Sequence, residues 1–247
     1  MAEPLYRRVL LKLSGGALGS KTGLYDWPVV NSLCEDIGRL VQGGVSVAVV
    51  VGGGNILRGR ELDPKQLDRN TADTMGMLAT VMNGLALRET LQRQGVPVKL
   101  MSALHVDQAA QAYDPFIAGK YLKKGYVLIL SGGTGHPFFS TDTGAALRAA
   151  ELRADALLKA TDVPGVFDRD PQKDENAKMY RQLTFQQVIE QELGVMDLTA
   201  ITLCKDNSIP VRVFGLQLKH ALINVCFNEG MGTTIKSVEN YSGGQDD

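Results

Sequence analysis

The chain has 247 residues, 44% of them hydrophobic and 21% charged, and its net charge of −1 lacks the basic excess of a nucleic-acid-binding protein. The longest apolar run, residues 45–51, is too short to span a bilayer, and the N-terminus lacks the small-residue cleavage site of a signal peptide. The three cysteines are scattered and form no C-x-x-C pair, so we expect a cytoplasmic protein with free thiols. From the net charge and the short apolar runs, we expect that it binds neither nucleic acid nor membrane.

Apolar runs and helical spacing alternate along the chain. In the first half they predict, in order, a strand at 9–14, a helix at 27–42, a strand at 45–51, a helix at 71–94, a strand at 96–101 and a helix at 107–124. In the second half they predict a strand at 126–130, a helix at 144–153, a strand at 156–160, helices at 184–193 and 198–206, a strand at 210–214, a helix at 216–227 and a short edge strand at 233–236. We interpret residues 1–240 as one α/β domain with a mostly parallel sheet covered on both faces, followed by a flexible tail at 241–247.

Three glycine loops follow predicted strands, at 14–16, 52–55 and 132–135. Ligands of an open parallel sheet lie beyond the carboxyl ends of its strands, so we expect the three loops at one edge of the sheet. Glycine lets backbone N–H groups approach an anion, and Lys12 and Arg58 add positive charge beside the loops. The pattern predicts a large polyanionic ligand or two phosphorylated ligands, although neither the P-loop nor the Rossmann glycine motif is present.

Two acidic residues are candidates for a reaction centre. Asp142 follows the third glycine loop, and Asp197 stands among apolar residues. Phosphoryl transfer needs cations, backbone donors and usually Mg²⁺, so a carboxylate here could orient a lysine or the metal. The competing interpretation is that each aspartate is the N-cap of a helix, and the residues alone leave both interpretations open.

Six ordered motifs carry a family resemblance. They are LLKLSGGAL (10–18), VVVGGGNILRG (49–59), MGMLATVMNGLALR (75–88), GGTGHPFFSTDT (132–143), LKATDVPGVFDRDP (158–171) and VMDLTA (195–200). On these motifs the chain closely resembles the bacterial uridylate (UMP) kinases of the amino acid kinase superfamily, from about residue 5 to residue 236.

The resemblance implies a three-layer αβα sandwich with a central, mostly parallel sheet. It implies transfer of the γ-phosphoryl group of MgATP to UMP, with the N-terminal part of the domain mainly binding UMP and the C-terminal part mainly binding ATP. It also implies a homohexamer that is activated by GTP and inhibited by UTP. The helix at 71–94 has more Met and Leu than one buried face needs, which fits either a subunit interface or a fully buried helix.

The resemblance also implies roles for individual residues. The catalytic residues would be Lys12, Asp142 and Asp197, with no residue assigned as a metal ligand. The ATP-binding residues would be Lys12, Leu13, Ser14, Gly15, Gly54, Arg58, Thr161, Phe167 and Asp170. The UMP-binding residues would be Gly53, Asp73, Thr134, Gly135, His136, Pro137, Phe138, Phe139, Ser140 and Thr141, with Asp73 accepting hydrogen bonds from the ribose hydroxyls. Arg88 and Lys99 match the effector site.

Two departures from the family pattern and two competing hypotheses accompany this interpretation. Gly16 stands where the family usually has Glu, and His136 stands where it usually has Asn. The chain could instead be another superfamily kinase, such as acetylglutamate or carbamate kinase, but Asp73 would then have no ribose to bind. It could also be a container for oxoanions like the molybdenum storage proteins, which the intact Lys12, Asp142 and Asp197 disfavour.

Overall fold

The computed structural model describes residues 3–20, 22–57, 65–171, 173–217, 220–228 and 230–237. Within these ranges, nine strands form one sheet. They are β1 (Arg8–Leu13), β2 (Ser46–Val51), β3 (Val98–Ser102), β4 (Gln111–Ala112), β5 (Val127–Ser131), β6 (Ala156–Thr161), β7 (Gln182–Thr184), β8 (Val211–Gly215) and β9 (Thr233–Lys236).

The strand order across the sheet is β4-β3-β5-β2-β1-β6-β8-β9-β7. Every neighbouring pair is parallel except β8 with β9, which is antiparallel. The mostly parallel sheet predicted from the sequence is therefore confirmed.

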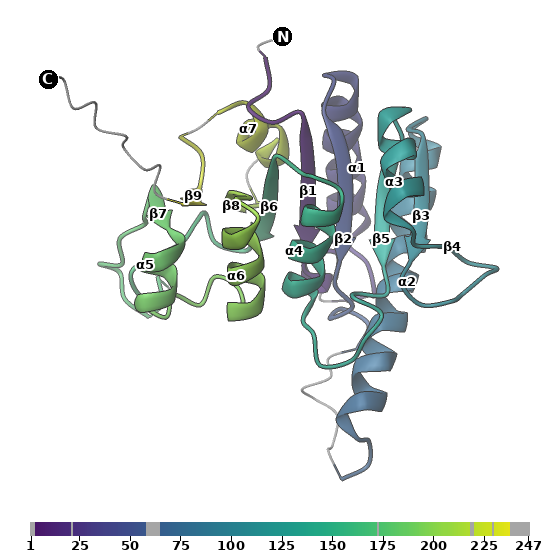
Figure 1. The fold of residues 1–247 in the computed structure, drawn as a ribbon, viewed down its shortest axis with the longest axis horizontal. Helices are drawn as coiled ribbons and strands as arrows, with labels where there is room; N and C mark the ends of the chain where they lie inside the picture. Colours follow the sequence, from purple (N-terminus) through teal and green to yellow (C-terminus); the bar gives the residue numbers. More distant parts are fainter. Residues whose placement is uncertain are drawn as a thin grey trace, which may run out of the picture.

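Helices cover both faces of this sheet (Figure 1). One face packs against α1 (Trp27–Gln42), α2 (Arg69–Arg93) and α7 (Ala221–Phe227). The other face packs against α3 (Pro115–Lys123), α4 (Thr141–Glu151), α5 (Phe185–Glu190) and α6 (Leu198–Asp206). This is the predicted three-layer αβα sandwich, and a short 3₁₀ turn, η1 (Gly15–Ala17), follows β1.

The central strands are apolar on both sides because both sides are buried. In β2, Val47 and Val49 pack toward α1, α2 and α7, whereas Ala48 and Val50 pack toward the opposite helices. Such runs have no polar face, and they read in sequence as short continuous apolar segments. The match between the predicted strands and β1, β2, β5, β6 and β8 follows from this pattern.

Local capping sets where the helices begin and end. The Asp26 side chain accepts a hydrogen bond from the Val29 N–H at the start of α1, and Gly44, with φ +85°, follows its end. The T-x-x-Q capping box predicted at Thr184 is present at the start of α5. Helix α2 has 25 residues and a length of about 37 Å, so it projects beyond the carboxyl edge of the sheet (Figure 1).

Five predicted helices have different bounds in the structure. The predicted helices 71–94 and 184–193 are observed at Arg69–Arg93 and Phe185–Glu190. The predicted helix 107–124 is wrong in its first half: Asp114 caps a helix that begins at Pro115, and residues 111–112 form β4. The predicted helix 216–227 begins only at Ala221. Helix α4 begins at Thr141 rather than at 144, since Ser140 is its cap.

The predicted edge strand at 233–236 is present as β9, but it is not an edge strand. It lies between β8 and β7, and β7, which no sequence pattern predicted, forms that edge. A three-residue strand is too short to show alternation in sequence. The predicted tail at 241–247 lies outside the described residues.

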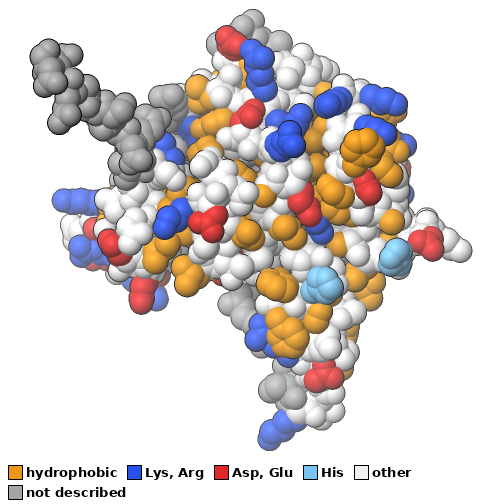
Figure 2. All heavy atoms as spheres, viewed as in Figure 1, with side chains coloured by type: hydrophobic (Ala, Val, Ile, Leu, Met, Phe, Trp, Pro, Cys, Tyr) orange, Lys and Arg blue, Asp and Glu red, His pale blue; other side chains and the backbone are white. Residues whose placement is uncertain are grey.

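The surface is mixed in character. Acidic, basic and hydrophobic side chains are interspersed over the face shown in Figure 2, with basic side chains gathered over α3, where Lys120, Lys123 and Lys124 are exposed. Among the described helices, none combines the length and apolar character needed to cross a membrane.

Candidate active site

The loops after β1 and β2 are packed backbone against backbone. A Cβ added to Gly15 would lie 2.3 Å from the backbone N of Gly54 and 2.8 Å from the side chain of Asn55. No residue with a side chain fits there without displacing a neighbour. The predicted meeting of these glycine loops at one edge of the sheet is therefore present, because β1 and β2 are neighbours in register.

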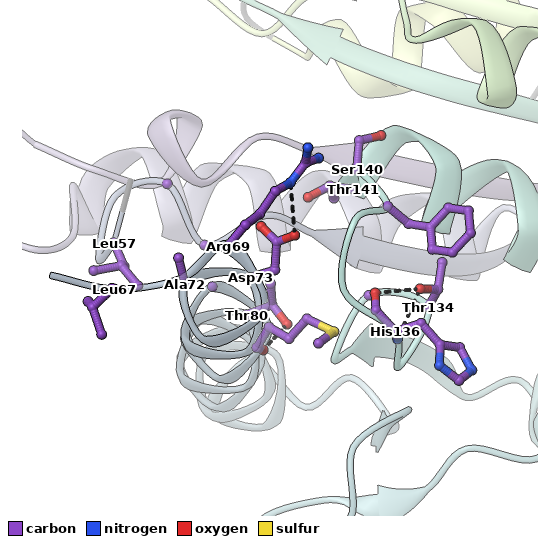
Figure 3. Close-up of a pocket in the computed structure, with 16 residues that line it drawn as sticks. Leu57, Leu67, Arg69, Ala72, Asp73, Thr80, Thr134, His136, Ser140 and Thr141 are labelled. Carbon is purple, nitrogen blue, oxygen red and sulfur yellow. Dashed lines mark hydrogen bonds and ion pairs between the residues drawn. The ribbon is translucent and has the colours of Figure 1, made fainter. Parts of the chain in front are cut away.

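A cavity of about 780 Å³ opens between α2 and the loop 132–140, and we call it the α2 cavity. Its volume is typical of a small-molecule site. Figure 3 shows Arg69 and Asp73 of α2 on one side, and Thr134, His136, Ser140 and Thr141 on the other. The lining residues are Gly53, Gly54, Leu57, Leu67, Arg69, Ala72, Asp73, Gly76, Met77, Thr80, Gly133, Thr134, His136, Phe139, Ser140 and Thr141.

Glycine is required where the loop 132–140 leaves β5. Gly132 has φ +76°, and a Cβ there would lie 2.9 Å from the backbone N of Leu104. The Gly132 N–H donates to the hydroxyl of buried Thr80 at 2.7 Å. The buried Arg148 guanidinium donates to the Gly133 carbonyl oxygen at 3.2 Å. The loop is thus held by its own backbone and by two buried side chains.

Asp73 connects α2 to the far end of this loop. Its Oδ2 atom accepts a hydrogen bond from the Phe138 N–H at 2.7 Å and lies 3.6 Å from the Arg69 guanidinium. Phe138 has φ +72°, an unusual conformation for a residue with a side chain, and Arg69 lies 5.0 Å from the centre of its ring. Asp73 therefore positions the loop through Oδ2, and among the described residues its Oδ1 atom accepts no hydrogen bond.

Three charged side chains meet where β1 and β6 approach their carboxyl ends and α4 begins. The Lys12 Nζ lies 2.7 Å from Asp142 Oδ1, and the Lys159 Nζ lies 2.7 Å from Asp142 Oδ2. Burial alone would raise the pKa of Asp142, but the two ammonium groups outweigh it and hold that pKa below its usual value. Asp142 is the second residue of α4 rather than its cap, so the capping interpretation is wrong for this aspartate.

Asp197, by contrast, is the N-cap of α6. One carboxylate oxygen accepts from the Ala200 N–H at 3.0 Å and from the Thr143 hydroxyl at 2.8 Å, and the other accepts from the Ser140 hydroxyl. The capping interpretation is therefore right for Asp197. The same carboxylate ties the start of α6 to the start of α4, beside the charged cluster.

A second cavity, of about 570 Å³, lies on the other side of that cluster, and we call it the β6 cavity. Its lining includes Lys159 and Thr161 of β6, the segment 163–171 and the segment 191–195. Thr141 lines the α2 cavity and Lys159 lines the β6 cavity, so the Lys12–Asp142–Lys159 cluster lies between the two.

The structure distributes the predicted site residues unevenly. The α2 cavity brings together Gly53, Gly54, Asp73, Thr134, His136, Phe139, Ser140 and Thr141, and the β6 cavity brings together Thr161, Phe167 and Asp170. Gly135, Pro137 and Phe138 belong to the loop but not to the lining. Arg58 lies outside the described residues.

Two residues predicted to bind ATP, Leu13 and Ser14, lie where β1 ends. Ser14 is half-buried, whereas Leu13 is buried. The Ser14 hydroxyl accepts from the Ala17 N–H and caps η1. Leu13 is fully buried in the core, and its carbonyl oxygen accepts from the Gly52 N–H, so its side chain reaches neither cavity.

The two residues matched to an effector site lie apart from both cavities. Arg88 of α2 donates to the Ala109 carbonyl oxygen at 3.1 Å. The Lys99 ammonium of β3 lies 5.3 Å from the ring centre of Tyr121 and 5.5 Å from that of Tyr126.

Lys159 and Arg69 are two of the cavity residues that the sequence interpretation missed. Lys159 interrupts the apolar run of a strand buried on both faces, and that interruption is the signal that could have found it. Arg69, at the start of α2, carried no such signal because a basic residue near a helix end is common on any surface.

Comparison with known proteins agrees with the fold and identifies the family. A family model described as Amino acid kinase family matches residues 7–215, so the chain belongs to the amino acid kinase family. The crystal structure of a UMP kinase from Bacillus anthracis superposes with a TM-score of 0.91 at 37% identity, covering 95% of this chain and 97% of that one. A UMP kinase from Ureaplasma parvum superposes with a TM-score of 0.88 at 36% identity, covering 94% and 99%.

Curated sequences narrow the assignment within that family. The protein of Stutzerimonas stutzeri named uridylate kinase is 49% identical over 235 residues, 95% of each chain. The uridylate kinase of Alcanivorax borkumensis is 48% identical over 238 residues, 96% of this chain and 94% of that protein. These similarities place the chain in the uridylate kinase branch, a group of phosphotransferases.

Proposed function

We propose that the protein transfers the γ-phosphoryl group of MgATP to UMP, giving UDP and ADP. The observation that carries this proposal is the position of the buried Lys12–Asp142–Lys159 cluster between two cavities of nucleotide size. Phosphoryl transfer needs a donor, an acceptor and a cation at the point where they meet. The names of the relatives, uridylate kinase and UMP kinase, support UMP as the acceptor.

We assign UMP to the α2 cavity. Backbone N–H groups of the glycine loops suit its phosphate, and the Thr134 and His136 side chains suit the polar edge of a base. Asp73 already accepts from Phe138 through Oδ2, which leaves Oδ1 to accept from the ribose hydroxyls. A deoxyribose would leave this acceptor with fewer donors, so the site would favour the ribonucleotide.

We assign MgATP to the β6 cavity. Thr161 and Phe167 border the space for adenine and ribose, and Asp170 lies at its rim. The N-terminal part of the domain then mainly binds the acceptor, and the C-terminal part mainly binds the donor.

Transfer takes place at the cluster between the cavities. Lys12 neutralises charge on the moving phosphoryl group, and Asp142 holds the Lys12 ammonium in place. Mg²⁺ arrives as part of the MgATP substrate and lowers the charge of the phosphate chain. Asp197 acts by fixing Ser140 and Thr143 at the start of α4.

A substrate panel with coupled ADP detection tests this function. UMP, dUMP, CMP, acetylglutamate and carbamate are offered with MgATP, and we expect turnover with UMP to exceed that with any other by at least about tenfold. Activity on acetylglutamate or carbamate but not on UMP would reject the proposal. Molybdenum bound to the purified protein, without kinase activity, would favour the oxoanion container.

We further propose a homo-oligomer, with the hexamer as the expected state. Met75, Leu78 and Met82 of α2 are 37%, 44% and 48% exposed, and Trp27 at the start of α1 is 49% exposed. Such an apolar stripe on two adjacent helices suits a subunit interface. Light scattering should give a mass well above 26.7 kDa for the wild type and a lower mass for Leu78→Glu.

We also propose that GTP and UTP control the enzyme through the region of Arg88 and Lys99. We further propose that the protein is cytoplasmic. A cation beside aromatic rings, as Lys99 lies beside Tyr121 and Tyr126, suits contact with a nucleotide. Rates measured with GTP or UTP added at saturating substrates test the regulation, and unchanged rates with both would reject it.

A further inference from the structure

Lys159 has a position that the proposed roles of Lys12 and Asp142 do not explain. Lys12 and Lys159 are direct partners in the parallel β1–β6 ladder, so both side chains leave the sheet on the same face. Helix α4 begins over that face, where each oxygen of Asp142 pairs with one ammonium group. The strand register therefore brings two positive charges together, and one carboxylate lies between them.

This arrangement is nearly buried. The side chains of Lys12, Lys159 and Asp142 are 10%, 12% and 15% exposed. Like charges held close in a poorly solvated site destabilise a fold, and apolar residues of similar size would be less costly. Lys12 alone can pair with Asp142. The Asp197 carboxylate also attracts Lys159, but its oxygens already accept from Ser140, Thr143 and Ala200, so ion pairing for stability does not account for the second ammonium group.

Lys159 also lines the β6 cavity. Within the described residues, its ammonium group donates to Asp142 and to the Val195 carbonyl oxygen. An ammonium group has three donors, so one N–H remains for a ligand in the cavity. A phosphate oxygen is a strong acceptor for such a charged donor.

We propose that Lys159 is a second phosphate-binding lysine, which contacts the phosphate chain of the donor nucleotide and holds Asp142 against Lys12. The inference rests on the proposed function, since MgATP is the ligand assigned to the β6 cavity. Lys12 and Lys159 then approach the phosphates from adjacent strands, with Asp142 keeping their ammonium groups apart.

The charge balance at Lys159 agrees with this geometry. Burial lowers the pKa of Lys159, Asp142 opposes that effect, the Lys12 ammonium adds to it, and the Asp197 carboxylate also opposes it. An anionic phosphate chain in the cavity would supply further opposite charge and would favour the protonated amine.

The test compares Lys159→Met, which keeps the length of the side chain but removes its charge, with the wild type. We expect kcat to fall about 100-fold and the affinity for a nonhydrolysable ATP analogue to fall about tenfold, while the KM for UMP stays within about twofold. Lys159→Arg, which retains the charge, should recover part of both losses. Lys205→Met, at an exposed lysine of α6, is the matched control and should change none of these values.

Wild-type kcat or wild-type analogue affinity in Lys159→Met would overturn the inference. Equal losses for both nucleotides, with a lowered unfolding midpoint in both Lys159 variants, would also overturn it, because they would indicate a role confined to stability. The analogue titration does not depend on the acceptor. If the wild type binds the analogue but does not phosphorylate UMP, the proposed function fails, and the titration still decides the role of Lys159.

Discussion

The two cavities are bounded by different kinds of structure. The loop 132–140, which borders one side of the α2 cavity, is shaped by its backbone: Gly132, Gly133 and Gly135 all have positive φ, and buried Thr80 accepts from the first of them. Asp73 anchors the far end of the same loop through the Phe138 N–H.

The rim of the β6 cavity is instead held by exposed side chains. Arg169 pairs with Asp174 at 3.0 Å and with Asp168 at 3.4 Å, and its own side chain is 57% exposed. Backbone N–H donation from Lys178, together with Arg169, keeps the pKa of Asp168 below its usual value. Exposed ion pairs contribute little to stability, so we expect the shape of the α2 cavity to be fixed and that of the β6 rim to be adjustable.

Lys12→Ala tests the point where the two regions meet, and it should have the largest effect. We expect kcat to fall about 10³-fold while the KM for UMP changes by less than about threefold, because Lys12 acts on charge that develops during transfer. Asp142 keeps its pairing with Lys159, so the fold should persist. Steady-state kinetics measures kcat and KM separately. A change confined to KM would show that Lys12 does not act on the charge that develops during transfer.

Gly132→Ala tests whether backbone fixes the α2 cavity. The added methyl group would meet the Leu104 backbone at 2.9 Å in a residue with φ +76°, so we expect a loss of about 2 kcal/mol of unfolding free energy. The KM for UMP should rise about 30-fold and that for ATP less than twofold, if a loop shift costs about 2 kcal/mol of UMP binding.

Gly16→Ala is the matched control, since a Cβ at Gly16 meets no atom within 4 Å. It should leave stability and both KM values unchanged. If Gly132→Ala raised the two KM values equally, or behaved like Gly16→Ala, the contrast between the cavities would be lost.

Asp73→Asn sharpens the assignment of UMP to the α2 cavity. The amide can still accept from the Phe138 N–H, but it is a weaker acceptor for ribose hydroxyls. We expect the preference for UMP over dUMP, measured as the ratio of kcat/KM values, to fall about tenfold. An unchanged ratio would exclude Asp73 from contact with the ribose.

Arg169→Gln should have the smallest effect, because it removes only exposed ion pairs from the β6 rim. We expect the KM for ATP to change by no more than about twofold and the unfolding midpoint by no more than about 1 °C. A large rise in the KM for ATP would mean that the rim is as rigid as the α2 cavity.

Much of the fold follows from local patterns. The runs at 45–51 and 156–160 are apolar except for Ser46 and Lys159, which predicts strands buried on both faces, and α6 begins and ends where its capping aspartate and spacing indicate. The predicted helix 107–124 failed because its apolar spacing outweighed the Asp114–Pro115 pair, a strong start signal within it. Strand β7 has only three residues, too few for any period.

For the site, the glycine loops and their common edge could be predicted, because every parallel strand ends at the same edge of its sheet. The helix-cap interpretation was wrong for Asp142 and right for Asp197, and one reason explains both outcomes. Asp142 and Asp197 both stand near helix starts, yet Ser140 caps α4 and frees Asp142 for the lysines, whereas Asp197 is itself a cap. Only the exact start of each helix decides between these roles.

By itself, the sequence determined the alternation of strands and helices, the positions of the glycine loops and the family, because each depends on residues close together in the chain. Only the tertiary structure decided that β6 lies beside β1 and that Lys159 stands next to Lys12. Strand order is set by how the helices pack over the whole sheet. No local pattern can therefore report which distant residues become neighbours.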